Sequence, residues 1–79
     1  MVSILRLPAV KVVTGNSRST LYLRISQGLF VKPVKLGPRA VGFPQNEVAA
    51  INSARIAGKS DEEIRQLVLT LEAARKDAA

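Results

Sequence analysis

The sequence of 79 residues contains no cysteine and no histidine. These absences exclude disulfides, thiolate chemistry and the usual zinc ligands. A chain without cysteine also fits a reducing compartment, and we expect a cytoplasmic protein. Tryptophan is missing too, and aromatic residues make up only 4% of a chain that is 47% hydrophobic. The core of this small domain must therefore be mainly aliphatic.

Long hydrophobic runs are also absent. No segment reaches the roughly 18–20 apolar residues that span a membrane, and Arg6, Pro8 and Lys11 interrupt the N-terminal region where a signal peptide would lie. The chain also lacks a glycine-rich phosphate loop, and a single acidic residue precedes Asp61. We therefore predict a protein that is not an enzyme, binds no metal or cofactor and has no contact with membranes.

Acidic residues are scarce in most of the chain. Residues 1–59 carry nine basic residues against one acid, Glu47, whereas residues 60–79 carry three basic and five acidic residues. A basic surface of this strength in a small domain indicates a polyanionic partner, because neutralising phosphates releases counterions. The alternative is a surface whose charge serves only solubility.

Glycine and proline divide the first part of the chain into short elements. Pro8–Val13 reads as a helix with proline at its start, and Gly15 suits a left-handed residue at the helix end. Ser17 is a good N-cap for a second helix over 18–27, and Gly28 ends it. Two short helices joined by a tight turn that contains glycine predict a helix-turn-helix.

Next, hydrophobic residues occupy every second position on both sides of a Gly-Pro turn. This alternation predicts a β-hairpin over residues 34–43. Lys35 and Arg39 would project outward near its tip, as the wing of the domain. The alternation assigns four residues to an inner face: Val34, Leu36, Val41 and Phe43.

The rest of the chain predicts two more helices. The first spans Gln45–Ala57, with Val48, Ile51 and Ala54 on one face, and stops at Gly58. The second begins at a capping box formed by Ser60 and Glu63. It carries an amphipathic stripe that would pack on the same domain, pair two copies in a homodimer, or bind a partner protein: Ile64, Leu67, Val68 and Leu71.

These elements predict a mainly α fold with a small β-hairpin. We expect a winged helix-turn-helix DNA-binding domain in residues 1–58 and a C-terminal amphipathic helix in residues 59–79, packed on the domain or contacting a partner.

The second helix has two distinct faces on a helical wheel. Leu21 and Ile25 would enter the core, whereas Ser19, Tyr22, Leu23 and Ser26 would face away from it, flanked by Arg18 and Arg24. Such a face suits the major groove, where arginine reads guanine and hydroxyl groups reach phosphates or base edges. The alternative is a capped surface helix with solvated arginines. Leu23 would touch a thymine methyl, pack on a partner or fill a gap in the fold.

The hairpin region adds Lys32, Lys35 and Arg39, which suit contacts with phosphates or the minor groove. The same charges would also block edge-to-edge strand pairing, and both roles are compatible. Lys11 is a further candidate for a phosphate contact.

Three blocks of the sequence resemble the AlpA family of phage and prophage regulators, over residues 4–57. They run from Ile4 to Val10, from Thr14 to Tyr22, and from Phe30 to Phe43 followed by Glu47-Val48. The family is similar to MerR-type winged helices and to phage excisionases. The resemblance implies a reading helix that carries Ser17, Arg18, Ser19, Thr20 and Tyr22, and a wing with Lys32, Lys35 and Arg39.

The resemblance implies a sequence-specific transcription regulator, with a positive effect on prophage or mobile-element genes. Such an activator would contact RNA polymerase directly, at initiation or as an antitermination-type factor. An excisionase-like factor, which binds and bends attachment-site DNA beside an integrase, is the alternative, because one fold serves both roles. An adaptor that uses only the tail is a third hypothesis. RNA binding is a fourth, although the paired aromatics that stack bases are missing.

Overall fold

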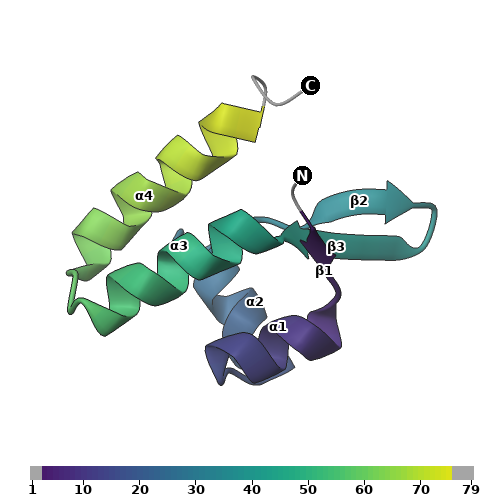
Figure 1. Ribbon diagram of the computed structural model, residues 1–79, viewed down its shortest axis with the longest axis horizontal. Coiled ribbons are helices and arrows are strands. Elements are labelled where there is room, and N and C mark those ends of the chain that lie inside the picture. Colours follow the sequence, from purple (N-terminus) through teal and green to yellow (C-terminus); the bar gives the residue numbers. More distant parts are fainter. Residues whose placement is uncertain (1–2, 76–79) are drawn as a thin grey trace.

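The computed structural model describes residues 3–75, which form four helices and a three-stranded antiparallel sheet (Figure 1). Residues 1–2 of the predicted DNA-binding domain and 76–79 of the predicted tail lie outside the described residues. The architecture is compatible with the predicted winged helix. None of the helices in residues 3–75 has the length and hydropathy needed to cross a membrane. In chain order the elements are β1 (Ile4–Leu5), α1 (Leu7–Thr14), α2 (Arg18–Ser26), β2 (Val34–Gly37), β3 (Ala40–Pro44), α3 (Gln45–Ile56) and α4 (Asp61–Ala74).

Local signals set the helix ends where the sequence predicted them. Gly15 has a φ of 72°, in the left-handed region, and its N–H donates to the carbonyl of Lys11 at the end of α1. The Ser17 hydroxyl accepts a hydrogen bond from the Thr20 N–H, 3.2 Å away, and so caps α2. These contacts fix the sharp turn between α1 and α2, because each satisfies a backbone group that the helix end leaves unpaired.

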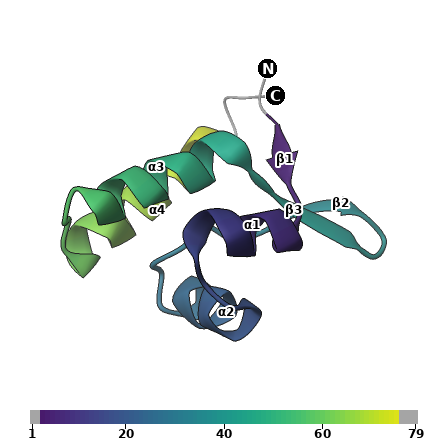
Figure 2. The ribbon, with the colours of Figure 1, turned by 60° about the horizontal axis from the view of Figure 1, so that its bottom comes forward.

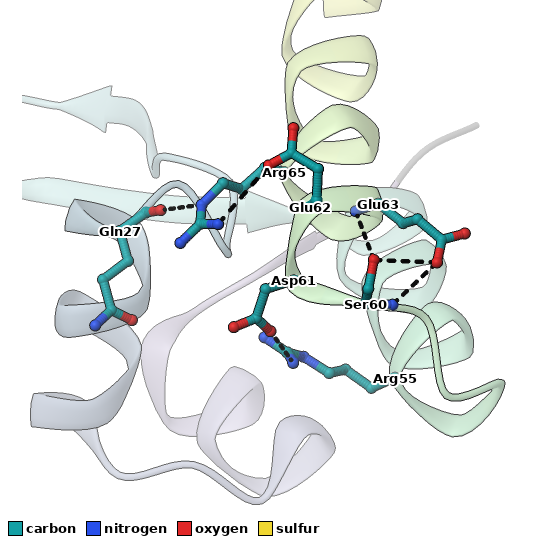
Figure 3. Close-up of polar contacts among 7 residues, drawn as sticks. All are labelled: Gln27, Arg55, Ser60, Asp61, Glu62, Glu63 and Arg65. Carbon is teal, nitrogen blue, oxygen red and sulfur yellow. Dashed lines mark hydrogen bonds and ion pairs between the residues drawn. The ribbon is translucent and has the colours of Figure 1, made fainter.

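The capping box at the start of α4 is confirmed. The Ser60 hydroxyl accepts from the Glu63 N–H at 3.2 Å, and the Glu63 carboxylate accepts from the Ser60 N–H at 3.1 Å (Figure 3). The Glu63 carboxylate accepts hydrogen bonds first from the Ser60 backbone N–H and then from the Ser60 hydroxyl, and these bonds lower the pKa of Glu63 below its ordinary value, since they favour the charged form.

The core is mainly aliphatic, as predicted, with the Phe30 and Phe43 rings 5.6 Å apart within it. Leu21 is buried and Ile25 packs beside it, so the inward face of α2 is confirmed. Ten hydrophobic side chains of the described residues are buried: Val10, Leu21, Leu29, Phe30, Val31, Phe43, Val48, Ile51, Ile64 and Val68.

The amphipathic stripe of α4 completes this core. Ile64 and Val68 are buried, and Leu67 and Leu71 pack against the cluster. In Figure 1, α4 lies beside α3. The structure therefore supports the alternative in which the stripe packs on its own domain. Ile64 and Val68 are therefore not available to another protein, whereas Leu67 and Leu71 are half-buried, and their contact with a partner stays a prediction.

The hairpin is present, but its register differs from the predicted one. The strands pair Val34 with Gly42 and Lys35 with Val41, and the register shifts between Lys35 and Gly37. Because directly opposed residues share a face of the sheet, Val41 lies on the same face as Lys35, and Val34 lies on the other. The single inner face predicted from the alternation is therefore wrong. Leu36 and Val41 are exposed.

The first strand, β1, is an element that the sequence did not indicate. It pairs with β3, which places β3 in the middle of the sheet in the order β1-β3-β2. Gly42 permits this close approach. A Cβ at that position would overlap the Ile4 side chain and would lie 2.9 Å from Leu36 Cδ1 and 3.2 Å from the Leu5 carbonyl oxygen.

Candidate nucleic-acid interface

Ion pairs are distributed unevenly over the molecule. Every ion pair within residues 3–75 involves side chains between Glu47 and Arg75. No acidic residue precedes Glu47 in the chain. Seven basic side chains therefore have no ion-pair partner within the described part of the chain, and all but the half-buried Arg24 are exposed to an external polyanion: Arg6, Lys11, Arg18, Arg24, Lys32, Lys35 and Arg39.

Helix α2 presents an exposed face at the edge of the domain, below α1 in Figure 2. The structure brings together Arg18, Ser19, Tyr22 and Leu23 as exposed residues of this helix. The Arg18 guanidinium lies over the Tyr22 ring, 5.8 Å from its centroid, within the range of a cation–π contact. This contact restrains both side chains, which lowers the entropy lost when they bind a ligand.

The first turn of α2 has a structural role as well. The Ser17 hydroxyl donates to Thr20 Oγ1 at 3.0 Å while it accepts from the Thr20 N–H. Ser17 and Thr20 thus bind each other, and the helix start depends on them. This turn contains no acidic residue, so the partial positive charge of the helix N-terminus is uncompensated and suits a phosphate.

Arg24 is set apart from the exposed residues of α2. It is half-buried and lines a cavity with side chains of α1 and α3. The wheel placed it beside the outward face, but the packing of α2 turns that flank of the helix toward α3. Its predicted contact with DNA stays a prediction.

The hairpin formed by β2 and β3 projects from the helices at the right of Figure 1. Lys35 on β2 and Arg39 in the turn between the strands are exposed, as predicted. Lys32 precedes β2 and lies outside the hairpin. Its N–H donates to the Glu72 carboxylate at 2.9 Å, so the backbone at this position is held against α4. Lys32 therefore lies beside the wing and not on it, but its side chain is exposed, and its predicted contact with DNA stays a prediction.

A buried ion pair joins α4 to this segment, and the sequence did not predict it. Glu47 is only 4% exposed. Its carboxylate accepts from Arg75 Nη2 at 2.6 Å and from Arg75 Nε at 3.0 Å. The hydrogen bond to Glu47 raises the pKa of Arg75. Arg75 Nη2 also donates to the Lys32 carbonyl at 2.7 Å, so one guanidinium connects α3, α4 and the approach to the hairpin. Glu47 gave a signal for this pair, as the single acid among residues 1–59.

Residues 3–55 match the family described as prophage CP4-57 regulatory protein (AlpA). A relative from Enterobacteria phage P4, described as uncharacterized protein ORF88, is 44% identical over 55 residues. That match covers 70% of this chain and 62% of the relative, less than two thirds of its length. No solved structure matches the chain. The family match extends from β1 nearly to the end of α3 and contains α2 and the hairpin, and the chain belongs to the AlpA family of prophage regulatory proteins.

Proposed function

We propose that this protein is a sequence-specific regulator that binds double-stranded DNA and acts on prophage or mobile-element genes. The observation that carries the proposal is the set of exposed cations on α2 and the hairpin, which have no acidic partner within residues 3–75. Unpaired cations on a helix and on an adjacent hairpin match the two surfaces with which a winged helix-turn-helix contacts a duplex.

In this proposal, α2 enters the major groove and the hairpin follows the phosphate backbone. Arg18 reads a guanine edge, Ser19 and Tyr22 supply hydroxyl groups, and Leu23 contacts a thymine methyl. Lys35 and Arg39 bind phosphates or the minor groove and fix the orientation of the domain on the duplex. Binding of this kind needs no catalytic group and no cofactor, so we also propose that the protein is not an enzyme.

For the regulatory step, we propose positive regulation in the cytoplasm through direct contact with RNA polymerase, at initiation or as an antitermination-type factor. The match to a family of prophage regulatory proteins supports a regulatory role. An excisionase-like role beside an integrase would use the same DNA-binding surfaces, and the arrangement of binding sites on DNA separates the two.

The test is selection of bound sequences from a random duplex pool at near-physiological salt. Wild type, Arg18→Ala and Lys59→Ala are compared in parallel, and Lys59→Ala controls for the loss of one positive charge outside α2 and the hairpin. We expect a motif for wild type and Lys59→Ala that degrades in Arg18→Ala. A single site near a promoter supports regulation, and tandem direct repeats with measurable bending support the excisionase role. Binding without a motif that disappears on adding salt would contradict specific reading.

A further inference from the structure

Because Ile64 and Val68 of α4 are buried in their own domain, the protein contact proposed above would need another surface. A cavity of about 320 Å³ opens among α1, α2 and α3. In Figures 1 and 2, α1 and α3 both end on the side of the domain away from the hairpin. The cavity therefore lies apart from the wing, and from α2 it is lined by Arg24 and not by the exposed Arg18, Ser19, Tyr22 and Leu23 that are proposed to meet DNA.

The floor of this cavity is apolar, and its rim carries both apolar and polar side chains. Core residues Leu29, Phe30 and Ile51 line it from within. At the rim, Ile56 is 87% exposed and Val13 is 50% exposed. Two large aliphatic side chains in water beside an open apolar cavity form a surface that is suited to burial of an apolar side chain from another protein. Phosphates of a DNA backbone would gain nothing from such residues.

Two guanidinium groups line the same cavity. Arg55 Nη1 pairs with Asp61 at 3.3 Å, at the junction of α3 and α4 (Figure 3). Arg55 Nη2 is buried and has no hydrogen-bond partner among the described residues. Arg24 has no acidic partner within residues 3–75. Arg55 Nη2 has almost no surface that an external group could reach, whereas a carboxylate would bind the unpaired Arg24 guanidinium with a charge-assisted hydrogen bond.

We propose that the cavity between α1 and α3 binds an acidic segment of a partner protein. A large apolar side chain of that segment would fill the space above Phe30, and a neighbouring carboxylate would bind Arg24. This inference rests on the proposed function, because a regulator that is bound to DNA is what would require a protein contact at the cavity between α1 and α3.

The experiment is a selection of displayed random 12-residue peptides on the full chain, with counter-selection on Ile56→Glu. We expect enriched peptides to place Asp or Glu within four residues of a large apolar residue. A synthetic copy of such a peptide, followed by fluorescence anisotropy, should bind Ile56→Glu at least tenfold more weakly than wild type. Leu69→Glu is the matched control, because Leu69 is 60% exposed on α4 and lies outside the cavity. It should bind as wild type does.

Absence of enrichment, enrichment of peptides without acidic residues, or equal binding to Ile56→Glu would overturn the inference. Thermal unfolding of both variants verifies that they fold, as expected for changes at exposed positions. A 20-base-pair duplex, titrated in parallel, separates the two proposals. If Ile56→Glu loses more affinity for this duplex than Leu69→Glu does, the cavity belongs to the DNA interface and the docking inference fails. If wild type binds no duplex, the proposed function fails, whereas the peptide selection still decides the cavity.

Discussion

The two parts of this domain use charge differently. Residues 3–44 form β1, α1, α2 and the hairpin, and they contain seven basic residues and no acid. Residues 45–75 form α3 and α4 and contain all four ion pairs of the described chain. Paired charges in the second part connect helices to each other. Unpaired charges in the first part repel one another until an external anion neutralises them. Variants of charged residues in the second part should therefore change mainly the free energy of unfolding, and variants of charged residues in the first part mainly the affinity for DNA.

The largest effect on stability is expected from Arg75→Ala. This change leaves the Glu47 carboxylate buried without its partner, which costs about 3–5 kcal/mol of the free energy of unfolding for a buried pair. Urea unfolding measures the loss. Lys59→Ala removes an exposed cation that pairs with Glu63 at 3.7 Å, and it should change little, because exposed pairs contribute little. Equal effects of the two variants would contradict the role of the buried pair.

Next in size is Gly42→Ala, in the first part of the molecule. The added methyl group would force Ile4 and Leu36 away from the strand and press on the Leu5 carbonyl. Overpacking of this kind costs about 1–3 kcal/mol, which thermal unfolding would register. Gly37→Ala is the matched control on the same hairpin, because a Cβ there meets nothing within 4 Å. A similar loss in both variants would show that β1 does not approach β3 as closely as described.

On the binding side, Arg18→Ala should weaken the specific complex by about 1–3 kcal/mol and leave non-specific affinity nearly unchanged, if Arg18 reads a base. Fluorescence anisotropy with the selected motif and with a scrambled duplex gives both affinities. Unfolding by urea should be close to that of wild type, since Arg18 makes no ion pair within residues 3–75. An equal loss on both duplexes would reassign Arg18 to a phosphate contact.

Lys35→Ala should have a smaller effect that does not depend on sequence. Removal of one phosphate contact lowers the slope of log affinity against log salt by about 1. A salt titration on motif and scrambled duplexes measures it. An unchanged slope would remove Lys35 from the DNA interface.

The smallest effect concerns pH and lies in the second part. Hydrogen bonds from Ser60 lower the pKa of Glu63 in the folded state. The capping box therefore stabilises the fold above the pKa of an unfolded glutamate, about 4.3. This contribution is lost as the pH falls through the lower folded value. Melting temperatures of wild type and Glu63→Gln, which removes the titrating carboxylate and keeps Ser60, should differ at pH 7 and converge in acid. A difference that is constant with pH would exclude the charge of Glu63 as the cause.

Much of the local structure of this protein can be predicted from short segments of its sequence. Gly15, Ser17 and the pair Ser60–Glu63 each act within four residues, so the helix ends could be located without the fold. The same holds for the inward face of α2, because helical periodicity places Leu21 and Ile25 together. The resemblance to the AlpA family also depended on local blocks, and the family match over residues 3–55 confirms it.

The hairpin shows where local patterns stop being sufficient. Alternation predicted two strands, but it contains no signal for the register shift after Lys35 that moves Val41 to the other face. Alternation also could not predict that β1 pairs with β3, since a strand of two residues has no periodicity. Register depends on which strands meet and on the bulge between them.

By itself, the sequence determined the four helices, their caps, the charge asymmetry and the family, because these depend on neighbours in the chain or on composition. Only the tertiary structure decided that α4 closes its own core, that the Lys32 backbone is bound to Glu72 of α4, and that Glu47 meets Arg75 across 28 positions. Such contacts arise when segments distant in sequence pack together. The position of each partner is then set by the whole fold.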